Sequence, residues 1–105
     1  ISIVGGDSIV IKDNWLFGAC ATTGNISAAT TASINGLIIG NVIQNQTADA
    51  DNKCIVLGAG DTYMIVDNRL AVIDSTSPAP VTAAGGYVSA NYKTGAAGVT
   101  ASVLM

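Results

Sequence analysis

The sequence contains no histidine and no glutamate, and it has few cations. Histidine is the usual proton shuttle near neutral pH and the commonest transition-metal ligand. Its absence excludes Ser-His and Cys-His nucleophile pairs and most zinc sites. Four cationic side chains and a net charge of −3 leave no basic stripe of the kind that nucleic acid binding requires. These absences predict a chain that is not an enzyme, needs no cofactor and does not bind nucleic acid.

Long apolar runs are also missing. The longest, "GLIIGNVI" at residues 36–43, is far shorter than the roughly 20 residues of a membrane-spanning helix, so no membrane span is expected. The chain begins with Ile1 rather than Met, which suggests a processed N-terminus or a fragment. Two glycosylation sequons, at Asn25 and Asn45, favour an extracellular or virion location.

The sequence does contain the residues typical of β-strands and turns. Apolar residues make up 50% of the chain and charged residues 10%. Short runs of β-branched side chains recur about every 8–12 residues with Gly, Asn, Asp or Pro between them, which is the all-β pattern. The expected strands lie at residues 1–4, 8–12, 15–20, 37–43, 54–57, 62–66, 69–73, 86–92 and 98–104.

This pattern predicts a single all-β domain over residues 1–105. The expected architecture is a sandwich, jelly roll or small barrel of about eight short, mainly antiparallel strands. The Asp67-Asn68 pair and the "KTGAA" segment at residues 93–97 are expected to form hairpins. No repeat of fixed period is evident. A compact β-solenoid is the lesser alternative, suggested by the Gly- and Asn-rich "SINGLIIGNVIQNQT" at residues 33–47.

Two aspartates are the weak candidates for a metal site. Asp49 and Asp51 have the spacing of the first two ligands of a calcium-binding loop. Lys53 and Cys54 then follow where further oxygen ligands should stand, and no glutamate completes the set. A solvated turn whose carboxylates accept local backbone N–H bonds is therefore favoured.

The "GAGD" segment at residues 58–61 looks like the start of a dinucleotide-binding loop because it follows an apolar strand. The third glycine of that motif would fall at Tyr63, and the segment after it is β-branched rather than helical. We expect a hairpin turn between two strands instead.

The chain has two cysteines, Cys20 and Cys54. They are either two buried apolar thiols or the partners of one disulfide. A catalytic thiol is not expected, because nothing near either cysteine except Lys53 could stabilise a thiolate.

With so little chemistry available, we expect a structural subunit of a larger assembly, such as a virion coat or decoration protein or an extracellular fibre or pilus-type subunit. A low-charge surface is easily desolvated, and strand-like ends at residues 1–6 and 98–105 can pair with a neighbour's sheet. The expected partners are copies of the chain or a scaffold protein. The side chains expected to mediate this assembly are those of Ile1, Ile3, Val99 and Val103.

The alternative is a small extracellular domain that binds carbohydrate or another ligand. Trp15, Tyr63, Tyr87 and Tyr92 would supply the stacking faces. Trp15 and Phe17 are instead favoured as core anchors, and Tyr87 and Tyr92 have opposite parity on one expected strand and so do not form one platform.

Overall fold

The computed structural model describes residues 1–20, 24–28, 35–46, 53–58, 60–72, 81–83, 87–94 and 103–104. Within these residues the chain forms thirteen β-strands and no helix. The strands are β1 (Ser2–Ile3), β2 (Val10–Lys12), β3 (Trp15–Gly18), β4 (Ile26–Ala28), β5 (Gly36–Ile39), β6 (Val42–Asn45), β7 (Ile55–Leu57), β8 (Tyr63–Val66), β9 (Arg69–Val72), β10 (Val81–Ala83), β11 (Tyr87–Ser89), β12 (Tyr92–Thr94) and β13 (Val103–Leu104).

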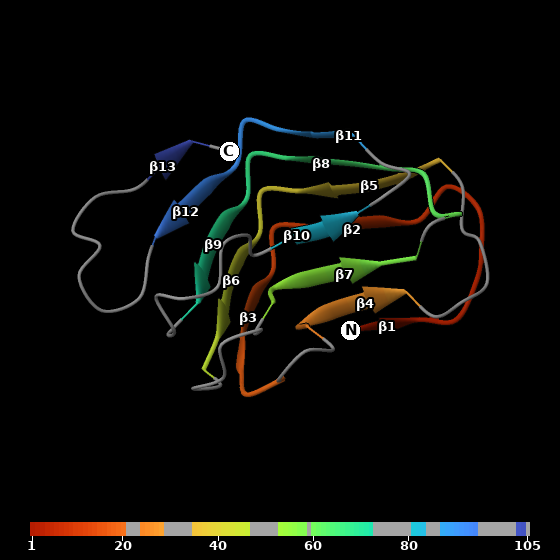
Figure 1. Ribbon diagram of the computed structural model, residues 1–105. Coiled ribbons are helices and arrows are strands. Elements are labelled where there is room, and N and C mark those ends of the chain that lie inside the picture. Colours follow the sequence, from red (N-terminus) through yellow and green to blue (C-terminus); the bar gives the residue numbers. More distant parts are fainter. Residues whose placement is uncertain are drawn as a thin grey trace.

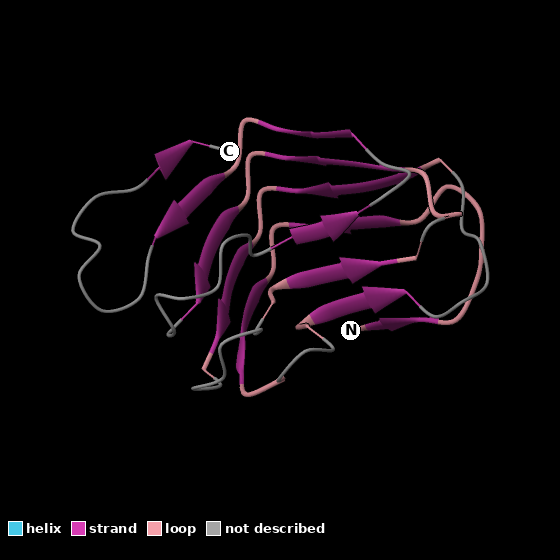
Figure 2. Ribbon diagram, viewed as in Figure 1, coloured by secondary structure: helices cyan, strands magenta, loops and turns pink. Residues whose placement is uncertain are grey.

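Successive strands enter three sheets in rotation (Figure 1). The first sheet has the order β1-β4-β7-β10, the second β2-β5-β8-β11 and the third β3-β6-β9-β12-β13. One strand from each sheet makes one coil, and the next coil stacks on it in parallel. The result is a four-coil parallel β-solenoid with all its walls made of strands (Figure 2).

The prediction of a sandwich, jelly roll or barrel of mainly antiparallel strands is therefore wrong. Every strand pair in the described part of the chain is parallel except β12 with β13. That antiparallel pair joins segments on either side of the predicted "KTGAA" hairpin, but Lys93 and Thr94 belong to β12 rather than to a turn, and residues 95–97 lie outside the described residues. Elsewhere the strands have only two to four residues, and each ends at a corner that leads into the next sheet rather than back along the same one.

The corner between the second and third sheets shows why the chain does not reverse. In each coil, one residue with positive φ stands directly before an asparagine: Asp13 (57°), Gly40 (68°), Asp67 (53°) and Ala90 (55°). A type I′ hairpin needs positive φ at both of its central residues. Asn68 does not have it. The predicted Asp67-Asn68 hairpin is thus a corner that leads from β8 into β9.

The core is a set of aliphatic stacks that run through the coils. In the second sheet Ile11, Ile38 and Ile65 occupy the same position of consecutive coils. Ile38 and Ile65 are completely buried, and so are aliphatic residues on the other two walls. Burial of each such side chain stabilises the fold by roughly 1.5–3 kcal/mol. The apolar residues of one strand therefore meet their equivalents in the next coil rather than those of an opposing sheet.

Candidate functional site

Four asparagines form a hydrogen-bonded ladder along the solenoid, one in each coil. They are Asn14, Asn41, Asn68 and Asn91, and each follows the corner between the second and third sheets. The Nδ2 atom of each donates to the Oδ1 atom of the next, at 3.0, 2.9 and 2.8 Å. The backbone N–H of each donates to the same Oδ1 atom, at 3.0 Å in all three cases.

The amides of the ladder also bind backbone carbonyls. Nδ2 of Asn68 donates to the carbonyl of Val66 in its own coil and to that of Ile38 in the preceding coil, both at 2.9 Å. Asn41, Asn68 and Asn91 have no exposed surface. Because a buried polar group that loses its partner costs roughly 1–3 kcal/mol, the ladder fixes how one coil sits on the next.

The ladder has a direction and two unequal ends. Asn14 donates to the second coil, but none of the described residues donates to its Oδ1 atom. At the other end, the backbone N–H of Asn91 finds no acceptor within the described part of the chain. Within the described residues, one end of the solenoid therefore presents the Oδ1 acceptor of Asn14, and the other end presents the backbone N–H donor of Asn91.

The local sequence pattern places Asn14 and Asn68 in turns and Asn41 and Asn91 inside strands, and it does not predict the ladder. The signal is their spacing: 27 residues from Asn14 to Asn41, 27 from Asn41 to Asn68 and 23 from Asn68 to Asn91. Each asparagine also directly follows a corner residue, Asp, Gly or Ala, that comes after the end of a strand. This repeat corrects the statement that no period is evident.

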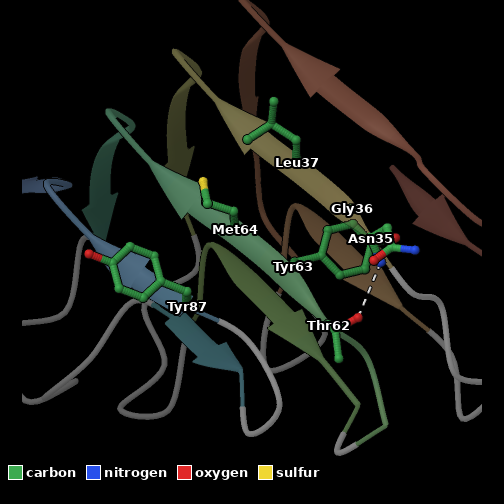
Figure 3. A pocket seen from close by; sticks show the side chains of 7 residues that line it. All are labelled: Asn35, Gly36, Leu37, Thr62, Tyr63, Met64 and Tyr87. Carbon is green, nitrogen blue, oxygen red and sulfur yellow. Dashed lines mark hydrogen bonds between the residues drawn. The ribbon is translucent and has the colours of Figure 1, made fainter.

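An open groove of about 470 Å³ lies on the outer surface of the second sheet (Figure 3). Leu37, Met64 and Tyr87 occupy matching positions on three neighbouring strands and make its apolar floor. Met64 is 49% exposed and Tyr87 59% exposed. Asn35 and Thr62 form a polar edge, where the backbone N–H of Asn35 donates to Oγ1 of Thr62 at 3.1 Å. The groove thus has an apolar floor and a polar edge on one side.

The side chains of this groove offer apolar contact, aromatic stacking and hydrogen bonds. Nδ2 of Asn35 already donates to Oδ1 of Asp7 at 3.2 Å. Tyr87 provides an exposed aromatic ring on which an apolar or ring-shaped ligand could stack. Across the described residues, no group of three or more His, Cys, Asp or Glu side chains is placed to hold a metal ion.

The predicted metal and turn residues have different outcomes. Asp49 and Asp51 lie outside the described residues, so the calcium-loop hypothesis stays a prediction. The hairpin turn predicted at "GAGD" is wrong, because β7 and β8 belong to different sheets. The segment is a corner in which Oδ2 of Asp61 accepts from the N–H of Gly58 at 2.6 Å, and the N–H of Asp61 donates to the carbonyl of Gly58 at 3.1 Å. The Asp61 carboxylate is 1% exposed and closes a corner between β7 and β8. The hydrogen bond that its Oδ2 accepts from Gly58 stabilises the backbone of this corner.

Both cysteines are reduced thiols in the structure. Cys54 is completely buried, and its Sγ donates to the carbonyl of Ala71 at 3.2 Å. The disulfide between Cys20 and Cys54 stays a prediction. Burial raises the pKa of the Cys54 thiol from its ordinary 9.0 to about 11, which makes the thiol unreactive at neutral pH.

The raised pKa of Cys54 predicts a loss of stability at alkaline pH. Between pH 9.0 and about 11 the thiol ionises in the unfolded chain but not in the folded one. The stabilising contribution is complete below pH 9.0 and disappears as the pH passes about 11, a fall of about 2–3 kcal/mol. Urea unfolding across this range should show that fall in the wild type and in Cys20→Ala, and a smaller one in Cys54→Ala. Equal curves for all three chains would contradict the assignment.

The asparagines of both sequons lie inside the fold. Nδ2 of Asn45 donates to the carbonyl of Lys53 at 2.6 Å, and its Oδ1 accepts from the N–H of Cys20 at 3.2 Å. Asn45 has no exposed surface, and Asn25 is 6% exposed. A glycan on either Nδ2 would not fit this fold, so the sequons do not support an extracellular location.

The aromatic residues are placed differently from the sequence prediction. Trp15 is 75% exposed and Phe17 51% exposed, and their rings meet edge to face with centroids 6.1 Å apart. The core-anchor prediction is wrong because the alternation of β3 turns Leu16, between them, toward the core. Tyr87 and Tyr92 both point outward, but from different sheets, so they do not form one platform.

The first coil is an open end of the solenoid. Its strands β1, β2 and β3 are each the edge strand at one end of their sheet (Figure 1). Of the eight exposed large hydrophobic residues in the described part of the chain, five belong to residues 1–18. These five are Ile1, Val4, Val10, Trp15 and Phe17.

Three of the four predicted assembly residues lie in the described part of the chain. Ile1 is 51% exposed, whereas Ile3 is 6% exposed and belongs to the core. The predicted arm at residues 1–6 contains β1, which pairs with β4 of the same chain. Val103 is in β13, paired with β12, and Val99 lies outside the described residues.

The fold and the ladder define this chain as a parallel β-solenoid with a buried asparagine ladder. Comparison with protein-family models, with curated protein sequences and with solved structures finds no match. None of the described residues forms a helix long and apolar enough to cross a membrane.

Proposed function

We propose that this chain is a non-enzymatic structural subunit of a larger assembly, such as a virion surface or an extracellular fibre. The observation that carries the proposal is the gathering of exposed apolar side chains on the first coil, whose three strands are all edge strands. An edge strand presents unpaired N–H and C=O groups, and apolar side chains beside it make pairing with another chain more favourable. The subunit thus has both a hydrogen-bonding edge and an apolar surface for a neighbour.

The charge distribution supports the same function. Natural edge strands are commonly protected by charged side chains, especially lysine. In the first coil Lys12 is the one lysine on an edge strand, and its Nζ lies 3.7 Å from the oppositely charged Oδ2 of Asp13. Charged residues make up 10% of the whole chain, so a neighbouring molecule has few charges to desolvate on most of its surface.

Substitution of Trp15 tests this function. The wild-type chain should associate increasingly with concentration in sedimentation velocity experiments, and Trp15→Lys should weaken that association about tenfold or more. Met64→Lys is the matched control because it also replaces an exposed apolar side chain by lysine, but on an interior strand of a sheet. A wild-type chain that stays monomeric at high concentration, or an equal effect of both substitutions, would reject the proposal.

The groove on the second sheet supports a second candidate function, the binding of a carbohydrate or another ligand with an apolar ring face. Tyr87 is exposed beside Met64 in a volume of about 470 Å³. Under this function a monomeric chain would bind members of a glycan array, and Tyr87→Ala would abolish that binding. Association that depends on Trp15, in a chain that binds no member of the array, would favour the structural function.

A further inference from the structure

We propose that the partner at the open end is a second copy of this chain, which docks head to tail so that its first coil stacks on the last coil of its neighbour. This inference rests on the proposed structural function and specifies its partner and geometry. The polarity of the asparagine ladder carries it. In the chain, the N–H of each asparagine donates to Oδ1 of the asparagine in the following coil. Asn91 of one copy is the matching donor for Oδ1 of Asn14 in the next.

The backbone of β2 is arranged for the same contact. The N–H of Leu37 donates to the carbonyl of Ile9, and the N–H of Asp13 donates to the carbonyl of Ile39. Along a strand in a parallel pair, the N–H and C=O groups of one residue point toward the partner strand, and those of the next residue point away from it. The N–H groups of Val10 and Lys12 therefore face away from β5, toward the open end, where another parallel strand could accept them.

The side-chain rows also continue across such a contact. On the outside of the second sheet, Val10, Leu37, Met64 and Tyr87 form an entirely apolar row in register. On the inside, Ile11 is 6% exposed whereas Ile38 and Ile65 are completely buried. A neighbour's β11 beside β2 would extend the outer row and cover Ile11. The contact between copies would then repeat the coil-to-coil contact that already exists within the chain.

The third sheet requires one rearrangement. There the last coil is covered by β13, whose two residues pair antiparallel with Tyr92 and Lys93. The strand β3 pairs with β6 over four residues. An incoming β3 that takes the place of β13 therefore replaces a two-residue ladder by a longer one. Docking includes this strand exchange, and β13 protects the last coil until a copy arrives.

The variant Val10→Pro tests the geometry. Proline removes an N–H that points out of the open edge, and proline is tolerated on edge strands whose N–H faces solvent. Val10→Thr is the matched control because it keeps both the N–H and the branched side chain. Head-to-tail docking predicts a wild-type series of dimers, trimers and longer oligomers in mass photometry. It also predicts that Val10→Pro alone remains monomeric while Val10→Thr assembles.

A mixing experiment identifies the orientation. A Val10→Pro copy still has an intact last coil, so it should accept one wild-type copy and end the growing chain. Adding it to the wild type should shorten the oligomers in proportion to its share. Asn14→Ala, which removes the Oδ1 acceptor, should do the same and serves as the second variant if Val10→Pro folds poorly. A wild type that stops at dimers, or oligomers that neither variant shortens, would overturn head-to-tail docking while leaving a structural role. A wild type that never associates would overturn both.

Discussion

Replacement of Asn68 by alanine should lower the free energy of unfolding by about 4 kcal/mol, a loss at the upper end for a single substitution. The Asn68 side chain accepts from the N–H and the Nδ2 of Asn41 at 3.0 and 2.9 Å. It donates to Oδ1 of Asn91 at 2.8 Å and to two backbone carbonyls. Alanine removes all these partners at once in a place that water does not reach, so several buried polar groups lose a hydrogen bond together.

The matched control is Asn14→Ala at the open end of the same ladder. Asn14 has the same type and position in its coil, but it is partly exposed and none of the described residues donates to its Oδ1 atom. Water can replace its lost bonds, so we expect a cost of about 1 kcal/mol. Urea unfolding followed by far-UV circular dichroism measures both values. Similar losses for Asn14→Ala and Asn68→Ala would show that the ladder does not hold the coils together.

Strand positions could be predicted from the sequence, whereas the sheets could not. β-Branched runs bounded by turn residues correctly place most strands, because that preference is local. The segment at residues 37–43 shows the limit: the sequence predicts one strand there, but Gly40 has a φ of 68° and turns the chain from the second sheet into the third at Asn41. Whether a short corner reverses the chain or leads it onward depends on one dihedral angle. The sequence of a single corner does not determine it.

The ladder was hidden for a related reason. Asn and Asp are the usual residues of turns, so an asparagine after a strand predicts a turn in any β fold. Its burial becomes visible only when several corners are compared at a spacing of 27 residues, as for Asn14, Asn41 and Asn68. The exposure of Trp15 was missed because aromatic residues are commonly buried. Here the alternation of a short strand places Leu16 inward instead.

Replacement of Gly36 by alanine is the second change with a large expected effect, a loss of about 3 kcal/mol in the free energy of unfolding. Gly36 is paired with Tyr63 across β5 and β8. A Cβ atom on Gly36 would overlap the ring of Tyr63. That ring is 2% exposed and is enclosed by the core, so it cannot swing out to solvent. The coil must either shift its backbone or force the ring out of its rotamer, and both cost energy.

Gly18→Ala separates this overlap from the general effect of removing a glycine. Gly18 also lies in a strand, but a Cβ atom there would meet no atom within 4 Å. Alanine at position 18 restricts the unfolded chain without a clash, so it should be neutral or stabilise by about 0.5 kcal/mol. Thermal and urea unfolding of the two variants should differ by about 3 kcal/mol or more. If the Tyr63 ring is the cause, the double variant Gly36→Ala with Tyr63→Leu should lose less than the sum of the single changes. Additive losses would mean that the two side chains do not compete for the same space.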